Sequence, residues 1–271
     1  MSDTKKRTRP VVKIHGGKYY LCNWVIDAFP KNYQEMIYVE PFCGAGSVFF
    51  NKEPSREDTI NDMDKGIVHI MWALRNETRE FIGRLKRLKY TEETFNRVKK
   101  KLEKNPEDYM DYAVAEFAVR RMSRGGLKKA FAWSNRERGG KPGDVNAWET
   151  MLKLLPELAE KLQGAYVLNK PAVEVIKAFD NPNTLVYCDP PYLHSTRTAT
   201  DAYDLELTED DHIELAVALN AFKGKAAISG YYSALYRDLY DGWTCKRKRI
   251  ANHSSQGKSK KQKTECLWLN Y

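Results

Sequence analysis

Four consecutive residues, Asp189-Pro190-Pro191-Tyr192, combine groups that suit the methylation of an amino group. Asp189 and Pro190 each precede a proline, which restricts them to extended backbone angles, and neither proline has an N–H. The segment therefore offers mainly acceptors, the carboxylate and the backbone carbonyls, beside the ring of Tyr192. Acceptors beside a stacking ring match the exocyclic NH2 of a nucleobase. Taken alone, the four residues fit a proline-rich surface turn equally well.

A second segment with chemical meaning is the turn at 40–47, which contains Gly44 and Gly46. Two glycines let the backbone approach a ligand closely. The turn lacks the Gly-Lys-Ser/Thr of a triphosphate-binding loop and the third glycine of a dinucleotide fingerprint. It therefore indicates close contact with a ligand other than a triphosphate, although an ordinary tight turn has the same pattern.

Two charged residues lie on either side of this turn in the sequence. Asp62 ends the next strand-like run, where a carboxylate can accept hydrogen bonds from ribose hydroxyls. Lys18 opens a predicted helix after Gly16-Gly17, where a cation is unfavourable unless it meets an anion such as a ligand carboxylate. The glycine turn, Asp62 and Lys18 together predict a ligand with a ribose, a carboxylate and no phosphates, and S-adenosylmethionine fits.

The pattern of apolar runs indicates which elements position these residues. It predicts strands at 37–39, 58–61, 166–168, 184–188, 225–229, 245–249 and 265–269. It predicts helices at about 18–29, 65–74, 208–221 and 231–239, with a further helix start at 47–50. Alternating strands and helices indicate an α/β fold with a parallel sheet. Ligands of such sheets lie outside the carboxyl ends of the strands, where 44–46, Asp62 and Asp189 fall.

The composition indicates a polyanionic partner. The net charge is +9, and neutralisation of phosphates with counterion release favours binding of basic proteins to nucleic acid. The five cysteines have no paired metal-ligand spacing, so we expect reduced thiols and no metal. The N-terminus has no apolar signal stretch and no run reaches membrane-spanning length, so we expect a cytoplasmic protein.

Residues 76–162 are rich in Lys, Arg and Glu with helical spacing. Within them, 120–141 interleaves glycines, cations and aromatic residues. This suits a loop or hairpin that enters a nucleic-acid groove, whereas a solvated surface over core aromatics is the alternative. The predicted DNA-binding residues are Arg120, Arg124, Lys128, Lys129, Arg136 and Arg138.

Four segments in this order resemble the motifs of the Dam-like (D12 class, α group) DNA N6-adenine methyltransferases of bacteria and their phages. They are 13–21, 38–48, 60–62 and 189–192. The last residues, 265–271, also resemble that family's final strand. The resemblance is good over about 10–75 and 165–271 and loose over 76–164, where the family's recognition domain varies.

The resemblance implies a Rossmann-like S-adenosylmethionine-dependent methyltransferase sheet with an inserted, mostly helical target-recognition domain. The catalytic domain would comprise 1–75 and 165–271, and the insert 76–164. The predicted cofactor-binding residues are Ile14, Lys18, Glu40, Phe42, Gly44, Gly46, Asp62 and Asp189; the predicted catalytic residues are Asp189, Pro190 and Tyr192. Position 14 is typically aromatic in the Dam enzyme, so Ile14 departs from the pattern.

The expected reaction is site-specific methylation of adenine N6 in duplex DNA, with the base flipped out and stacked on Tyr192. Hydrogen bonds from N6–H to the Asp189 carboxylate and the Pro190 carbonyl would localise the nitrogen lone pair. Methylation of cytosine N4, of RNA or of protein glutamine uses related chemistry. A catalytically silent DNA-binding module is a further alternative. The recognised DNA sequence, and a role in chromosomal regulation, restriction-modification or phage protection, stay open.

Overall fold

The computed structural model describes residues 7–14, 16–134, 136–193, 206–251 and 262–271. The chain divides into two compact units. The helical unit comprises Met1–Ile26, Cys43–Pro54 and Asp64–Asn169, and the sheet unit comprises Asp27–Phe42, Ser55–Met63 and Lys170–Tyr271. The predicted domain boundaries at 75 and 164 stay a prediction.

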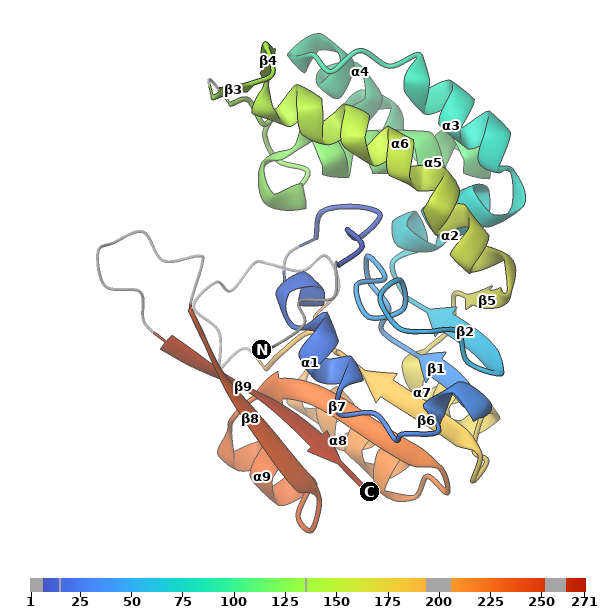
Figure 1. Cartoon of the computed structure of the whole chain (residues 1–271), viewed down its shortest axis with the longest axis vertical. Coiled ribbons are helices and arrows are strands. Elements are labelled where there is room, and N and C mark those ends of the chain that lie inside the picture. The colour runs from blue at the N-terminus through green and yellow to red at the C-terminus, as the bar shows by residue number, and fades with distance from the viewer. Residues whose placement is uncertain (1–6, 15, 135, 194–205, 252–261) are drawn as a thin grey trace. The chain divides into compact units, whose positions relative to one another are not determined.

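A seven-stranded mixed sheet is the main β element, with the order β5-β2-β1-β6-β7-β9-β8 (Figure 1). Its strands are β1 Ile37–Glu40, β2 Glu57–Asn61, β5 Ala165–Leu168, β6 Thr184–Cys188, β7 Lys225–Tyr231, β8 Thr244–Ala251 and β9 Gln262–Leu269. Strand β1 pairs parallel with β2 and β6, β6 pairs parallel with β7, and β9 pairs antiparallel with both β7 and β8. The α/β prediction is confirmed, and every predicted strand is present.

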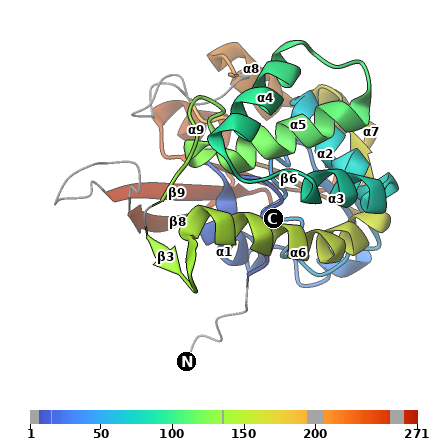
Figure 2. The ribbon, with the colours of Figure 1, turned by 90° about the horizontal axis from the view of Figure 1, so that it is seen from above.

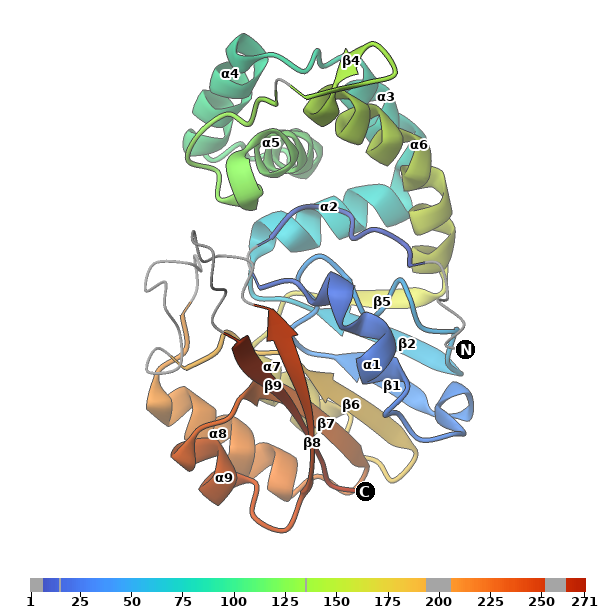
Figure 3. The same cartoon turned by 60° about the vertical axis from the view of Figure 1, so that its left-hand side comes forward.

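The central strand β6 is buried along its whole length, as its apolar run predicts. In the sheet unit, the helices are η2 Tyr33–Glu35, α7 Ala172–Ala178, α8 Glu209–Asn220 and α9 Ala234–Leu239. The predicted capping box of α8 is confirmed, because Thr208 and Asp211 each accept a hydrogen bond from the other's backbone N–H. In Figure 3, α8 and α9 lie beside the C-terminal strands.

The helical unit contains the predominantly helical stretch that the composition of 76–162 predicts. Its elements are η1 Lys18–Tyr20, α1 Cys22–Ile26, α2 Lys65–Asn76, α3 Thr78–Lys86, α4 Glu92–Glu103, α5 Tyr109–Met122, η3 Arg124–Gly126, α6 Gly143–Gln163 and a hairpin of β3 Glu137–Arg138 with β4 Lys141–Pro142. Helix α4 packs along α5 (Figure 2). Phe117 joins two helices of the core, with its ring 5.7 Å from those of both Phe81 and Trp148.

Three predicted helices are shorter or absent. The helix expected over 18–29 consists of the short helices η1 and α1, and it cannot continue through Phe29, which precedes Pro30. The helix start at 47–50 is a run of turns, with Phe50 N donating to Gly46 O at 2.9 Å. At 231–239 only α9 is helical, because Tyr231 still pairs in β7 and Ser233 caps the helix.

No helix among the described residues is long and apolar enough to cross a bilayer. The five cysteines are free, and all except Cys245 are buried. Most of the thiols therefore serve as small packed side chains, as expected.

Candidate active site

Three carboxylates lie at the carboxyl ends of neighbouring parallel strands in the sheet unit. Glu40 ends β1, Asp62 directly follows β2, and Asp189 directly follows β6. Because β2, β1 and β6 are adjacent, with Glu40 in register with Ile60, these residues belong to one edge of the sheet. We call Glu40, Asp62 and Asp189 the acidic edge. It is the position where parallel sheets bind ligands.

The acidic edge is held by buried hydrogen bonds. Glu40 is only 2% exposed and accepts a hydrogen bond from the Tyr38 hydroxyl at 2.8 Å. Asn61, next to Asp62, donates to the carbonyl of Pro41 and to that of Lys170, both at 2.9 Å. Its own amide oxygen accepts from Lys170 N at 2.9 Å. Asn61 thus joins three segments of the edge, a role that its sequence position does not reveal.

The electrostatics of this edge favour positive charge. Burial raises the pKa of the Cys188 thiol well above its usual range, and Asp189 and Glu40 raise it further. Burial, followed by Asp189, also raises the pKa of the Tyr187 hydroxyl well above its usual range. Nearby carboxylates disfavour any further negative charge and favour a cationic ligand.

The Asp189–Tyr192 segment leaves β6 and differs in exposure along its length. Asp189 is half-buried, whereas Pro190 and Tyr192 are buried. The Tyr192 hydroxyl donates to Glu265, and its ring stands edge-on to Tyr231 with 4.7 Å between ring centroids. The ring therefore packs into the sheet unit, and stacking of a base on it stays a prediction.

The other predicted cofactor residues belong to the helical unit, apart from Phe42, which is a half-buried residue of the sheet unit. Gly44 and Gly46 both have positive φ, 48° and 72°. A Cβ on Gly44 would lie 2.6 Å from Ile14 Cδ1, so Ile14 packs directly against the turn, and the positive φ of Gly44 disfavours any side chain there. Lys18 is buried at the start of η1. The structure thus brings Ile14 onto the glycine turn.

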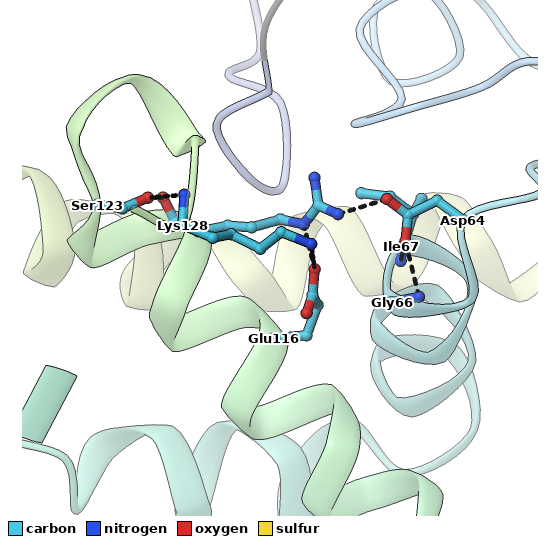
Figure 4. Close-up of polar contacts among 7 residues, drawn as sticks. Asp64, Gly66, Ile67, Glu116, Ser123 and Lys128 are labelled. Atoms are coloured by element: carbon cyan, nitrogen blue, oxygen red, sulfur yellow. Dashed lines mark hydrogen bonds and ion pairs between the residues drawn. The ribbon is translucent and has the colours of Figure 1, made fainter. Parts of the chain in front are cut away.

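Arg120 and Lys128 converge on the buried carboxylate of Glu116, and Figure 4 shows Lys128 pointing toward it. Arg120 Nε lies 2.6 Å from Glu116 Oε1, and Lys128 Nζ lies 3.3 Å from the same oxygen. Arg120 also forms an ion pair with Asp64, which caps α2 by accepting from Gly66 N. We call Asp64, Glu116, Arg120 and Lys128 the Glu116 network.

Burial separates the six predicted DNA-binding residues into groups. Arg120 is only 5% exposed and Lys128 is half-buried, so both are engaged in the Glu116 network. Arg124, Lys129 and Arg136 are exposed. Arg138 lies in β3, and its side chain falls outside the described part of the structure. The three exposed members of this set therefore all follow α5 in the chain.

The segment 123–133, the basic loop, folds back on itself. Arg124 N donates to Ala130 O at 3.0 Å, and Ala132 N donates to Met122 O at 2.8 Å. Gly125 and Gly126 have positive φ, and Trp133 is 52% exposed while stacking on Phe131. The expectation of a loop or hairpin with interleaved cations and aromatics is confirmed in this segment. Its contact with DNA stays a prediction.

No group of His, Cys, Asp and Glu side chains in the described ranges could hold a metal ion. In the sheet unit, the candidate site residues are carboxylates at strand ends and a proline-rich segment after β6.

The chain belongs to the D12 class N6 adenine-specific DNA methyltransferases, whose family model matches residues 15–255. Similar proteins include the type II methyltransferase M.MjaIII of Methanocaldococcus jannaschii, 25% identical over 97% of this chain and 99% of that protein. The DNA adenine methylase of Escherichia coli K12 is 27% identical over 97% of this chain and 96% of that protein. A solved SAM-dependent methyltransferase from Agrobacterium tumefaciens aligns with a TM-score of 0.42 at 11% identity, covering 100% of this chain and 72% of that one.

Proposed function

We propose that this chain methylates N6 of a flipped-out adenine in duplex DNA, with S-adenosylmethionine as the methyl donor. Membership of the D12 class gives the reaction and DNA as the substrate. The observation that carries the assignment of residues is the acidic edge, where Asp189 directly follows the central strand β6 beside Glu40. Acting on the DNA of a bacterial cell, the enzyme would work in the cytoplasm.

The residues present fit S-adenosylmethionine by their chemistry. Asp62 can accept hydrogen bonds from ribose hydroxyls, Lys18 can pair with a carboxylate, and Gly44 and Gly46 leave room beside the backbone. The acidic edge suits the positive charge of a sulfonium. When bound, S-adenosylmethionine supplies an electrophilic methyl group. Ile14 contributes an apolar contact instead of the aromatic stacking that is typical of this position in the Dam enzyme.

The clamp formed by Asp189 and Pro190 acts on the adenine amino group. N6 is a poor nucleophile because its lone pair is delocalised into the ring. Hydrogen bonds from N6–H to the Asp189 carboxylate and the Pro190 carbonyl hold the lone pair on nitrogen and stabilise the positive charge that develops there. An aspartate carboxylate is too weak a base to deprotonate N6 first. Alignment and electrostatic stabilisation thus carry the transfer.

DNA contact falls mainly to exposed cations of the helical unit. Arg124, Lys129 and Arg136 face solvent, so their guanidinium and ammonium groups can meet phosphates or base edges. The buried Arg120 and the half-buried Lys128 hold the fold behind them. The recognised sequence depends on which bases the basic loop meets.

In vitro methylation of mixed-sequence DNA tests this function. The protein and S-adenosylmethionine are incubated with duplex DNA, and the digested nucleosides are analysed by mass spectrometry. We expect N6-methyladenine, and sequencing of the modified positions would give the recognised site. Formation of N4-methylcytosine would overturn the choice of base. If the protein binds both S-adenosylmethionine and DNA but transfers no methyl group, the enzymatic assignment is overturned.

A further inference from the structure

We propose that Glu265 is a positioning residue that fixes the ring of Tyr192 for methyl transfer. This inference rests on the proposed function. It concerns a buried acidic residue of β9 that the mechanism above does not use. Glu265 is 1% exposed and Tyr192 is 6% exposed, so both groups of the pair are removed from water.

The ring of Tyr192 is held by its hydroxyl and by a ring contact. The hydroxyl donates to Glu265 Oε1. The ring packs against that of Tyr231 in a T-shaped arrangement, with a centroid distance of 4.7 Å and an interplanar angle of 75°. Tyr231 and Glu265 are register partners across the β7–β9 pairing, so one pair of strands supplies both supports. The position of the ring is therefore set by the sheet itself.

The Tyr192 hydroxyl stays protonated and can donate to Glu265 at ordinary pH. A carboxylate acceptor strengthens a hydroxyl hydrogen bond relative to a neutral acceptor. Burial raises the pKa of the Tyr192 hydroxyl well above its usual range, and Glu265 and then Asp189 raise it further. The phenol therefore stays protonated and keeps donating throughout the pH range of an enzyme assay.

A fixed ring matters because Tyr192 lies two residues after Pro190 in the clamp. The plane of the ring and the acceptors of the clamp together define where a flipped base can lie. A ring ordered before the base arrives avoids the entropy of ordering it during the reaction. Loss of the Glu265 contact should therefore slow the transfer step while leaving S-adenosylmethionine binding unchanged.

The inference is tested by changing each partner of the Tyr192–Glu265 hydrogen bond in turn. Tyr192→Phe removes the donor and Glu265→Gln replaces the carboxylate by a neutral amide, and both are combined in a double variant. The control is Tyr187→Phe, which removes another buried hydroxyl of the sheet unit, one that pairs with Ser229 at 2.9 Å. Three quantities are measured. They are the single-turnover rate on an unmethylated duplex that contains the recognised sequence, the Kd for S-adenosylmethionine and the thermal unfolding midpoint.

We expect each single variant to lower the single-turnover rate about tenfold, a factor that reflects misalignment of the acceptor base. The double variant should be no slower than the slower single variant, because both remove one interaction. Tyr187→Phe should keep the wild-type rate. The Kd for S-adenosylmethionine should not change in any of the variants.

A wild-type rate in Glu265→Gln, or a double variant whose two defects multiply, would overturn the inference. If Glu265→Gln does not fold, Tyr192→Phe decides: a wild-type rate overturns the inference, and a slow rate with unchanged Kd supports it. Absence of N6-methyladenine with the wild-type protein would instead overturn the proposed function, so the two failures are distinguishable.

Discussion

The two units of this protein each bury a glutamate to 1% exposure, but they satisfy it in opposite ways. In the helical unit, Glu116 faces two cations, Arg120 and Lys128. In the sheet unit, Glu265 accepts from the neutral hydroxyl of Tyr192. The first arrangement pairs the carboxylate with cations inside the fold, whereas the second joins a carboxylate to the hydroxyl of Tyr192.

This difference fits the ligand that each unit is proposed to bind. The helical unit uses paired charges to hold its helices and leaves Arg124 and Lys129 facing solvent, where DNA phosphates can reach them. The sheet unit has carboxylates at the ends of β1 and β6, where the proposed sulfonium and amino group would bind. A buried glutamate therefore binds cations in one unit and a tyrosine hydroxyl in the other.

Removal of an acceptor from the acidic edge should have the largest effect. We expect Asp189→Ala to lower the rate of methyl transfer by roughly 10²–10³-fold, comparable to the loss of one charge-stabilising hydrogen bond at an active site. DNA affinity should persist, since the exposed cations remain. Single-turnover kinetics and a binding assay measure the two quantities. Asp180→Ala, whose carboxylate binds Lys223, is the control; near-normal turnover in Asp189→Ala would refute the clamp.

Disruption of the Glu116 network should affect stability instead of chemistry. Glu116→Leu leaves the buried guanidinium of Arg120 without one of its two carboxylate partners, and we expect the free energy of unfolding to fall by about 3–5 kcal/mol. Glu80→Gln removes a carboxylate that is 47% exposed and paired with Arg84, so its cost should stay below about 1 kcal/mol. Urea unfolding compares the two. If both variants lose the same free energy of unfolding, the buried network stabilises the fold no more than an exposed ion pair does.

A single methyl group tests how closely α2 and α5 pack. In Gly66→Ala the new Cβ would lie 2.6 Å from Glu116 Cδ, which the network holds in place. We expect a loss of about 1–3 kcal/mol from overpacking. The matched change Gly83→Ala, in α3, meets nothing within 4 Å and should stabilise by about 0.5–1 kcal/mol. Thermal or urea unfolding gives both values, and a neutral Gly66→Ala would contradict close packing.

The smallest effects should come from the exposed cations. Arg124→Gln and Lys129→Gln should each lower the slope of log affinity against log salt by about 1, because one fewer counterion is released from DNA. Lys223→Gln, in the sheet unit and paired with Asp180, should leave the slope unchanged. Fluorescence anisotropy at several salt concentrations provides the slopes. Identical slopes for all variants would remove the basic loop from the DNA interface.

The sequence predicted much of the fold because a buried strand and a helix cap each depend on residues that are close together in the chain. The apolar run 184–188 is buried along its whole length, and the capping box at Thr208 forms as its spacing predicts. Short helices were less predictable. Tyr231 stays in β7 because an antiparallel partner, β9, satisfies its backbone, and that partner lies more than 30 residues away in the sequence.

The sequence by itself determined the α/β class, the strand ends that carry Asp62 and Asp189, and the motifs typical of the D12 class. These properties depend on periodicity and on residues close together in the chain. Only the tertiary structure decided which buried groups pair: Tyr192 meets Glu265 across 73 positions, and Arg120 meets Asp64 across 56. Such partners are selected by packing, because burial makes an unsatisfied polar group costly, and no spacing rule encodes that choice.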